Sequence, residues 1–365
     1  MNINRKAYQV IGGLIASYVT VAIASAQPYI QREYGATAGV VTQVSIANLK
    51  ANWVVTGVRN SAGNLQVITW KSNGTQLVRA GSMTAGAISS VATADLGSSR
   101  FATAVVNGSG NLELIVFSVS STGALAREGD FVGEAVKTVD ITKLSSSRVA
   151  TAVRDSAGDL TISVWGVDSN GTITAKGSVT DGAVSKASIA AMSSTQLVTA
   201  SETSAGTLLV SSWAVSSSGN LTHQDDATAG GITQVAVTPW ADLGHLGTAV
   251  VNNSGNLEVI DWIVDSATGA ITRQTSYTVG AASKVAVTTN GTLIFTTIRD
   301  ASGKLNVGVW GYDNNNKFDE AASFEYDATG VLAAAPLSTS SLTVTASRNS
   351  SGDLELNLWV YGVIH

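Results

Sequence analysis

Short runs of apolar and β-branched residues recur along the chain, separated by polar turns. A typical unit has such runs at 148–154, 159–167 and 172–177, and the run at 183–190 is the expected inner strand of the next unit. The turns between them, 155–158 (DSAG) and 168–171 (DSNG), combine Asp, Ser and Asn with Gly, which accept the backbone angles of tight turns at little cost. Because the runs are short and lack a helical period, they predict β-strands.

One motif anchors the unit: a glycine, a polar residue and a leucine, with an aromatic residue seven positions after the glycine. The glycines are Gly63, Gly110, Gly158, Gly206, Gly255, Gly303 and Gly352, and the aromatic residues are Trp70, Phe117, Trp165, Trp213, Trp262, Trp310 and Trp359. Seven copies of a unit of about 48 residues, each with four strands, predict an all-β chain. The expected fold is a seven-bladed β-propeller with four antiparallel strands per blade, with the aromatic side chains packed between blades.

The two ends of the chain complement each other in this scheme. The seventh copy stops at His365, soon after the strand that carries Trp359, and so lacks a fourth strand. The segment 29–38 aligns with the fourth strand of other copies, such as 76–85. An open ring would leave two unpaired sheet edges. We therefore expect residues 29–37 to complete the seventh blade and close the ring in a three-plus-one arrangement.

Residues 1–26 have the layout of a secretory signal peptide. A short positive start (MNINRK) precedes a stretch of apolar or small residues without charge, and Ala24-Ser25-Ala26 fits the small-x-small cleavage pattern. We expect cleavage before Gln27, which leaves a single propeller domain over 27–365.

An uncleaved membrane anchor is the alternative for this segment. A helical span needs about 20 mostly apolar residues, whereas this stretch includes Tyr8, Gln9, Ser17, Tyr18 and Thr20. No second candidate span follows. We therefore expect a mature protein without a membrane span that is secreted, periplasmic or held at the cell surface.

Composition excludes several classes of protein. Hydrophobic residues make up 44% of the chain and charged residues 13%, whereas disorder requires low hydrophobicity and high charge. The formal net charge is −5 and no Lys/Arg run is present, so nucleic acid is not an expected partner. The absence of cysteine rules out disulfides, thiolate zinc sites, iron–sulfur clusters and a cysteine nucleophile.

Four copies carry an arginine four positions before the anchor glycine, followed by Asp or Asn. The arginines are Arg59, Arg154, Arg299 and Arg348, and the residues after them are Asn60, Asp155, Asp300 and Asn349. On a propeller these turns project from one face, near the grooves between blades. One hypothesis is a ring of similar sites that hydrogen-bond sugar hydroxyls. The alternative, which we favour, is that each arginine packs along its own blade and pairs with the Asp or Asn of its turn.

One loop departs most from the repeat. Trp240 stands where other copies have a smaller residue such as Leu49, and it follows Pro239 in a loop that carries Asp242 and His245. A repeat protein can add a binding site at such a departure, so Trp240 and His245 are candidate ligand-binding residues. The alternative, which we favour, is that the tryptophan replaces leucine in a satellite core.

The chain shows no strong motif for metal binding or catalysis. Its three histidines belong to different copies, and residues 313–320 lack the central glycine of a calcium loop and place Lys317 at a ligand position. Neither G-x-S-x-G nor H-E-x-x-H occurs. Asp140, at an inner-strand position, is a lone carboxylate that could point into the central channel, whereas a glycosidase needs two. We expect no metal, no cofactor and no catalytic residue.

Two segments, 110–125 (GNLELIVFSVSSTGAL) and 255–271 (GNLEVIDWIVDSATGAI), resemble the G-x-L-E-V-F…G-A-L unit of secreted bacterial seven-bladed lectins of the Photorhabdus type. The resemblance implies sugar binding in grooves between blades. The aromatic residues that follow G-A-L in that family are absent here, since Leu125 is followed by Ala126, Arg127 and Glu128. No ligand residue is therefore carried over.

Three functional hypotheses follow. The first is an exported, multivalent binding module, lectin-like, with glycan or a cell-surface polymer as partner, because many similar shallow sites raise avidity. The second is a structural or surface-assembly protein of the envelope or an extracellular filament, which would self-assemble. The third is an enzyme that uses the channel or the Trp240 loop.

Overall fold

The computed structural model describes residues 27–240, 244–313, 317–326, 330–337 and 342–364. Within these ranges the chain consists of β-strands and turns, without a helix that could cross a membrane. The predicted signal peptide lies outside the described residues. In chain order the strands are β1 (Gln27–Lys50), β2 (Trp53–Asn60), β3 (Asn64–Ser72), β4 (Leu77–Gly97), β5 (Arg100–Asn107), β6 (Asn111–Val119), β7 (Leu125–Ser145), β8 (Arg148–Asp155), β9 (Asp159–Val167), β10 (Ile173–Ser193), β11 (Gln196–Thr203), β12 (Thr207–Val215), β13 (Leu221–Trp240), β14 (His245–Asn252), β15 (Asn256–Val264), β16 (Ile271–Thr289), β17 (Ile294–Asp300), β18 (Leu305–Tyr312), β19 (Phe318–Tyr326), β20 (Leu332–Pro336), β21 (Leu342–Arg348) and β22 (Asp353–Ile364).

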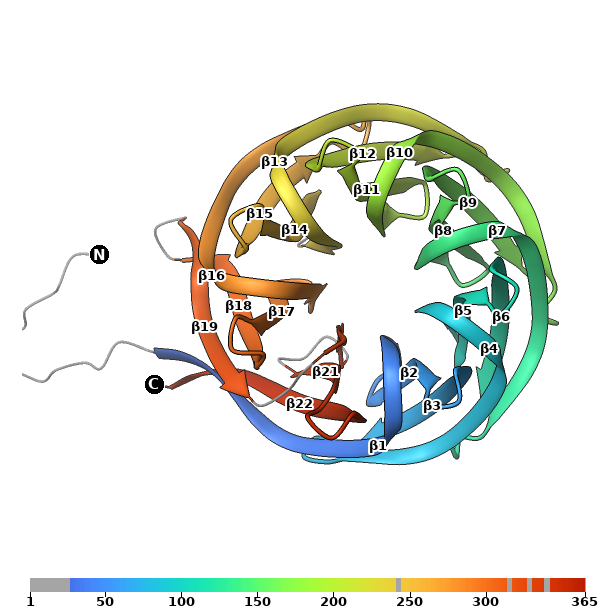
Figure 1. Cartoon of the computed structure of the whole chain (residues 1–365), viewed down its shortest axis with the longest axis horizontal. Coiled ribbons are helices and arrows are strands. Elements are labelled where there is room, and N and C mark those ends of the chain that lie inside the picture. Colours follow the sequence, from blue (N-terminus) through green and yellow to red (C-terminus); the bar gives the residue numbers. More distant parts are fainter. Residues whose placement is uncertain (1–26, 241–243, 314–316, 327–329, 338–341, 365) are drawn as a thin grey trace, which may run out of the picture.

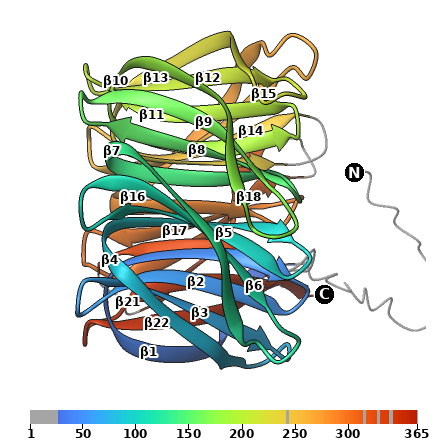
Figure 2. The same cartoon turned by 90° about the vertical axis from the view of Figure 1, so that its right-hand side faces the viewer.

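Hydrogen bonding divides the described strands into seven groups of four antiparallel neighbours. Groups 1 to 6 contain β1–β4, β4–β7, β7–β10, β10–β13, β13–β16 and β16–β19, and group 7 contains β20–β22 with the start of β1. The groups lie around a common axis (Figure 1), and the view from the side shows successive groups stacked against each other (Figure 2). This repeated all-β arrangement is compatible with a β-propeller.

The chain passes from one group to the next along a single long strand. In β10, residues 173–183 pair with β9 and residues 184–193 pair with β11. The sequence predicted two separate strands here, at 172–177 and 183–190. The structure joins them because register irregularities between Asp181 and Lys186 bend the strand without ending its hydrogen bonding.

The first and last strands are hydrogen-bonded neighbours. Because the long strands are shared between neighbouring groups, the described strands form one 22-stranded antiparallel sheet. This sheet is not closed: β19 of group 6 and β20 of group 7 are separate strands. The predicted pairing of the chain ends is confirmed, since β1 runs antiparallel to β22 with Tyr29 opposite Gly362 and Ala36 opposite Leu356. The start of β1 (blue) and the end of β22 (red) accordingly lie together in Figure 1. From Val41 onward β1 pairs with β2.

The anchor aromatic residues pack between neighbouring groups, as the sequence predicted. Trp165 of group 3 joins the core of group 2, and Trp359 of group 7 joins the core of group 6. Six indole N–H groups each donate to a threonine hydroxyl on the adjacent strand. These pairs are Trp70–Thr56 (3.0 Å), Trp165–Thr151 (2.9 Å), Trp213–Thr199 (3.1 Å), Trp262–Thr248 (2.9 Å), Trp310–Thr296 (2.7 Å) and Trp359–Thr345 (2.9 Å). Each pair satisfies a buried donor while the ring fills the space between groups.

Candidate functional site

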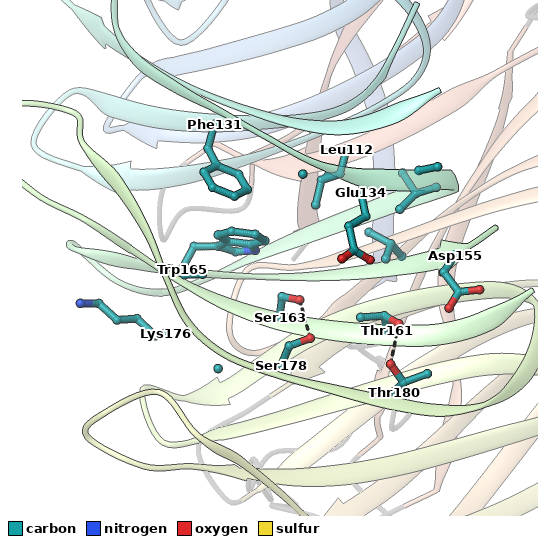
Figure 3. Close-up of a pocket in the computed structure, with 16 residues that line it drawn as sticks. Leu112, Phe131, Glu134, Asp155, Thr161, Ser163, Trp165, Lys176, Ser178 and Thr180 are labelled. Atoms are coloured by element: carbon teal, nitrogen blue, oxygen red, sulfur yellow. Dashed lines mark hydrogen bonds between the residues drawn. The ribbon is translucent and has the colours of Figure 1, made fainter. Parts of the chain in front are cut away.

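A groove of about 500 Å³ lies between groups 2 and 3, and we call it the first groove. Figure 3 shows Phe131 and Glu134 on one wall, contributed by β7, and Trp165 with a set of hydroxyl side chains on the other, contributed by β9 and β10. Asp155 lies at the end of β8, where the turn of the repeat begins. The groove therefore combines an aromatic part, a hydroxylated part and carboxylates.

The aromatic part consists of Phe131 and Trp165. Their ring centroids are 4.9 Å apart, with 51° between the ring planes. Trp165 is 6% exposed, whereas the five other anchor tryptophans are at most 2% exposed. The indole N–H of Trp165 is already bonded to Thr151. Trp165 therefore presents ring carbon to the groove rather than a hydrogen-bond donor.

Hydroxyl side chains line the wall formed by β9 and β10 in two cross-strand pairs. Ser163 and Ser178 share a hydrogen bond of 3.0 Å, and Thr161 and Thr180 share another of 3.0 Å. Each hydroxyl has one donor proton and two acceptor lone pairs, so a paired hydroxyl retains capacity for a ligand. The row gives the groove several neutral donors and acceptors at close spacing.

Two carboxylates and one amine complete the first groove. Glu134 and Lys176 are exposed, and Asp155 is half-buried. The Oδ1 atom of Asp155 accepts hydrogen bonds from the N–H groups of Asp159 (2.9 Å) and Gly158 (2.8 Å). These bonds, that from Asp159 foremost, hold the pKa of Asp155 below its usual value. Its carboxyl group is thus an ionised acceptor at neutral pH.

A second groove of about 480 Å³ lies at the equivalent place between groups 5 and 6. Leu112, Val153, Asp155, Thr161 and Ser178 of the first groove correspond in the repeat to Leu257, Ile298, Asp300, Asn306 and Ser323 of the second. An aromatic pair recurs at the equivalent positions of the repeat, with the Tyr277 and Trp310 ring centroids 5.8 Å apart, although these rings do not line the second groove. The two grooves are therefore lined by equivalent residues of the repeat.

The second groove is the more acidic of the two. Its lining includes Asp300, Glu320 and Glu325. Asp300 accepts the backbone N–H of Lys304 (2.9 Å), and Glu325 forms an ion pair with the Lys304 side chain. Burial raises the pKa of Glu320. Glu320 also has a side-chain hydrogen bond with Ser323, so all three carboxylates are engaged in local contacts.

Two of the four predicted arginines, Arg59 and Arg154, contact the neighbouring group rather than the Asp or Asn of their own turn. The Nε atom of Arg59 donates to the carbonyl of Ile88 (2.6 Å), and that of Arg154 donates to the carbonyl of Val184 (2.7 Å). For these two arginines the favoured alternative named the wrong hydrogen-bond partner, because the guanidinium group reaches across to the inner strand of the next group.

The Asp and Asn side chains that follow the arginines hold their own turns. Asn60 accepts from the N–H groups of Ala62 and Asn64, each at 3.0 Å, and Asp155 has the equivalent role in group 3. The structure brings Asp155 and Asp300 into the two grooves as well. Arg299 and Arg348 line a separate pocket between groups 6 and 7.

Trp240 and His245 lie opposite each other at the end of β13 and the start of β14. Trp240 is 3% exposed, donates its indole N–H to the carbonyl of Thr292 (2.8 Å) and stacks on Tyr312 with 9° between planes. This geometry agrees with the interpretation of Trp240 as part of a satellite core. Asp242, predicted in the same loop, lies outside the described residues.

A buried carboxylate, Asp261, joins this cluster. It accepts hydrogen bonds from Tyr312 (2.6 Å) and faces Nδ1 of His245 at 2.9 Å, and it is fully buried. Burial raises the pKa of Asp261, and burial together with Asp261 raises the pKa of Tyr312. Sequence reasoning missed Asp261, although a signal was present: the equivalent position holds Thr69 or Val116 in other copies.

Asp140 links two inner strands instead of standing free in the channel. Its carboxylate accepts the hydroxyl of Ser188 (2.8 Å) and the N–H of Ile189 (3.0 Å), both on β10. Among the described residues, no group of three or more His, Asp or Glu side chains is placed to hold a metal ion.

The sequence missed most of the first groove. Phe131, Glu134 and Trp165 were not proposed as ligand-binding residues, because Trp165 was assigned to the core and Phe131 has no motif of its own. Alignment of the copies offers a signal, since Phe131 shares its position with Tyr277 and Phe324.

Comparisons with known proteins bear on the fold alone. No protein-family model matches the sequence, and no curated protein sequence matches it. Among solved structures, a crystal structure of a protein from Lactobacillus plantarum, of propeller-type fold, is similar with a TM-score of 0.53 at 11% identity. The match covers 87% of this chain and 100% of that chain. At this identity the likeness supports a shared architecture and no shared activity.

Proposed function

We propose that this protein is an exported seven-bladed β-propeller, completed by pairing of β1 with β22, that binds carbohydrate in grooves between its blades. The fold part of the proposal is supported by the seven four-stranded groups, the pairing of the chain ends and the structural likeness. Export is supported by the layout of residues 1–26.

The observation that carries the binding proposal is the composition of the first groove. A sugar ring has apolar C–H faces, which pack on aromatic carbon, and hydroxyl groups, which bond to carboxylates and to other hydroxyls. Phe131 and Trp165 offer the aromatic surface, Ser163 and Thr161 belong to the hydroxyl row, and Glu134 is an exposed acceptor. A concave, partly apolar site with a few convergent polar groups is the usual form of a small-molecule site.

The presence of equivalent residues in two grooves supports multivalent binding. The second groove repeats the position of Asp155 as Asp300, and the repeat equivalents of Phe131 and Trp165 form the aromatic pair Tyr277 and Trp310, which does not line the groove. Two shallow sites on one rigid body raise the avidity for a polymer that spans both, even when each site is weak. A polysaccharide or a densely glycosylated surface is therefore a better partner than a single monosaccharide.

A glycan array with the purified protein tests the proposal, followed by calorimetry with the best-binding oligosaccharide. We expect Phe131→Ala and Glu134→Gln to weaken binding about tenfold, the equivalent of about 1.4 kcal/mol. Val132→Ala is the matched control, because Val132 neighbours Phe131 on β7, is 51% exposed and does not line the groove. An array that stays flat at high protein concentration would refute the proposal.

The same preparation separates the rival hypotheses. Concentration-dependent oligomers in light scattering, combined with a flat array, would favour a surface-assembly protein. Release of reducing sugar from a bound oligosaccharide, lost in a Glu320→Gln variant, would favour an enzyme acting in the second groove.

A further inference from the structure

Two cations face each other across neighbouring strands in group 6. Lys284 on β16 pairs directly with Arg299 on β17. At the equivalent place in group 4, Lys186 pairs with Glu202, and their side chains form an ion pair of 2.9 Å. Groups 4 and 6 therefore share a lysine at this place, but group 6 has an arginine opposite it where group 4 has a glutamate. Like charges directly opposite each other destabilise a sheet, so this position carries an unfavourable pair.

A third cation comes from the neighbouring group. Arg348, at the end of β21, lines the same pocket of about 400 Å³ as Lys284 and Arg299. The described lining residues include no Asp or Glu, and the described ion pairs involve none of these three cations. The chain as a whole has a net charge of −5, so this positively charged pocket contrasts with the overall charge.

Arg299 also has a buried donor without a partner. Arg59 and Arg154 donate Nε to a carbonyl of the next group, at 2.6 and 2.7 Å. Arg299 keeps the companion bond, from Nη1 to Ser283 (3.2 Å), as Arg59 does to Thr42 (3.0 Å). Its Nε atom, however, is buried without a hydrogen bond. A buried unpaired donor is costly, so the guanidinium group of Arg299 lacks a hydrogen bond that holds Arg59 and Arg154 in place.

We propose that this pocket, defined by Lys284, Arg299 and Arg348, binds a small oxyanion: a carboxylate, sulfate or phosphate group. Guanidinium groups hold such oxygens in a two-pronged geometry, and the ammonium group of Lys284 adds charge. The anion would relieve the repulsion between Lys284 and Arg299. The site is separate from the two grooves and does not depend on carbohydrate binding there. The bound group belongs either to a free inorganic anion or to an acidic saccharide.

Calorimetry and thermal unfolding test the site with sodium sulfate, sodium phosphate and sodium glucuronate, each against sodium chloride at equal ionic strength. We expect at least one anion to raise the Tm above the chloride control and to give a binding heat. Glucuronate binding without sulfate or phosphate binding assigns the site to an acidic saccharide. Binding of sulfate or phosphate shows that the site also accepts a free inorganic anion.

Lys284→Glu gives the decisive contrast, because it places a carboxylate opposite Arg299. It should weaken anion binding at least tenfold and raise the Tm in anion-free buffer. Lys186→Gln, at the equivalent position of group 4, should leave anion binding unchanged and lower the Tm. Phe131→Ala should also leave it unchanged, which keeps this test independent of the grooves. Absence of any effect beyond chloride, or wild-type anion affinity in Lys284→Glu, overturns the proposal.

Discussion

Phe117 lies directly opposite Phe101 on the adjacent strand, and their rings stack with centroids 5.1 Å apart and 18° between planes. In the other six groups this cross-strand pair joins tryptophan to a smaller residue, as in Trp70 opposite Val54. Compared with the Val54–Trp70 pair, the pair in group 2 has a smaller aromatic ring at Phe117 and a larger side chain opposite it at Phe101, so part of the aromatic volume lies on the other strand. Phe117 also lacks the indole donor, so the hydroxyl of Thr103 is buried without a hydrogen bond.

The threonine partners of the anchor residues should therefore differ in their contribution to stability. Thr56→Val leaves the buried indole N–H of Trp70 unpaired, and we expect the free energy of unfolding to fall by about 1–3 kcal/mol. Thr103→Val removes a hydroxyl that has no partner, so we expect no loss or a small gain. Urea unfolding of both variants checks this, and equal losses would contradict it.

Pairing of the chain ends should contribute strongly to stability. Ile30 on β1 is 5% exposed and packs in one core cluster with Trp359 and residues of group 6. We expect Ile30→Ala to lower the free energy of unfolding by about 2–5 kcal/mol, because it opens a cavity in that cluster. Val78→Ala, one residue from the equivalent position on β4 and 55% exposed, should change it by less than about 0.5 kcal/mol. Denaturant unfolding monitored by tryptophan fluorescence compares the two.

Close backbone contact between groups should make replacement of one strand glycine, Gly81, costly. A Cβ atom at Gly81 would lie 2.3 Å from the carbonyl oxygen of Gly123 in the next group, whereas one at Gly86 on the same strand meets nothing within 4 Å. We expect Gly81→Ala to cost about 1–3 kcal/mol through the clash. Gly86→Ala should be neutral or stabilise by about 0.4–1 kcal/mol, because it restricts the unfolded chain. Similar Tm values for the two variants would disprove this contact.

Asp140 should make stability fall as pH rises. Burial raises the pKa of Asp140 above its usual 3.8, although Ile189, Ser188 and Ile141 donate hydrogen bonds to it. The folded state then binds the proton more tightly than the unfolded state, so folding becomes less favourable as pH rises from 3.8 through the raised value. Relative to Asp140→Ser, wild-type protein should lose stability across this window. Chemical unfolding between pH 3 and pH 8 measures the difference.

Asp155 is the control, because its effect on stability should change with pH in the opposite direction to that of Asp140. Its pKa is lowered, first by the N–H of Asp159, so its stabilising effect is present above 3.8 and is lost as pH falls toward the lowered value. Relative to Asp155→Ala, wild-type protein should therefore lose stability only on acidification. If the difference in stability between wild type and variant changed with pH in the same direction for Asp140 and Asp155, the raised pKa of Asp140 and the lowered pKa of Asp155 would both be contradicted.

The sequence by itself determined the strands, their sevenfold repetition and the partner of the first strand. These features are local or periodic: glycine at the turns, apolar runs on the strands, and a missing fourth strand in the copy that carries Trp359. The segment 29–37 could be matched to that gap because it has the pattern of the fourth strand, and the observed pairing agrees. Such inferences are possible in a repeat protein because every unit has the same pattern of turns and apolar strands and therefore the same local structure.

Only the tertiary structure decided which side chains share a groove or a pocket. Phe131 contacts Trp165, and Arg299 lines the same pocket as Arg348. Both arrangements depend on how neighbouring groups pack against each other, which the periodicity of one chain segment does not encode. The unfavourable pair of Lys284 and Arg299 likewise depends on strand register. Contacts between groups join residues far apart in sequence, so their chemistry becomes visible only when the groups are assembled.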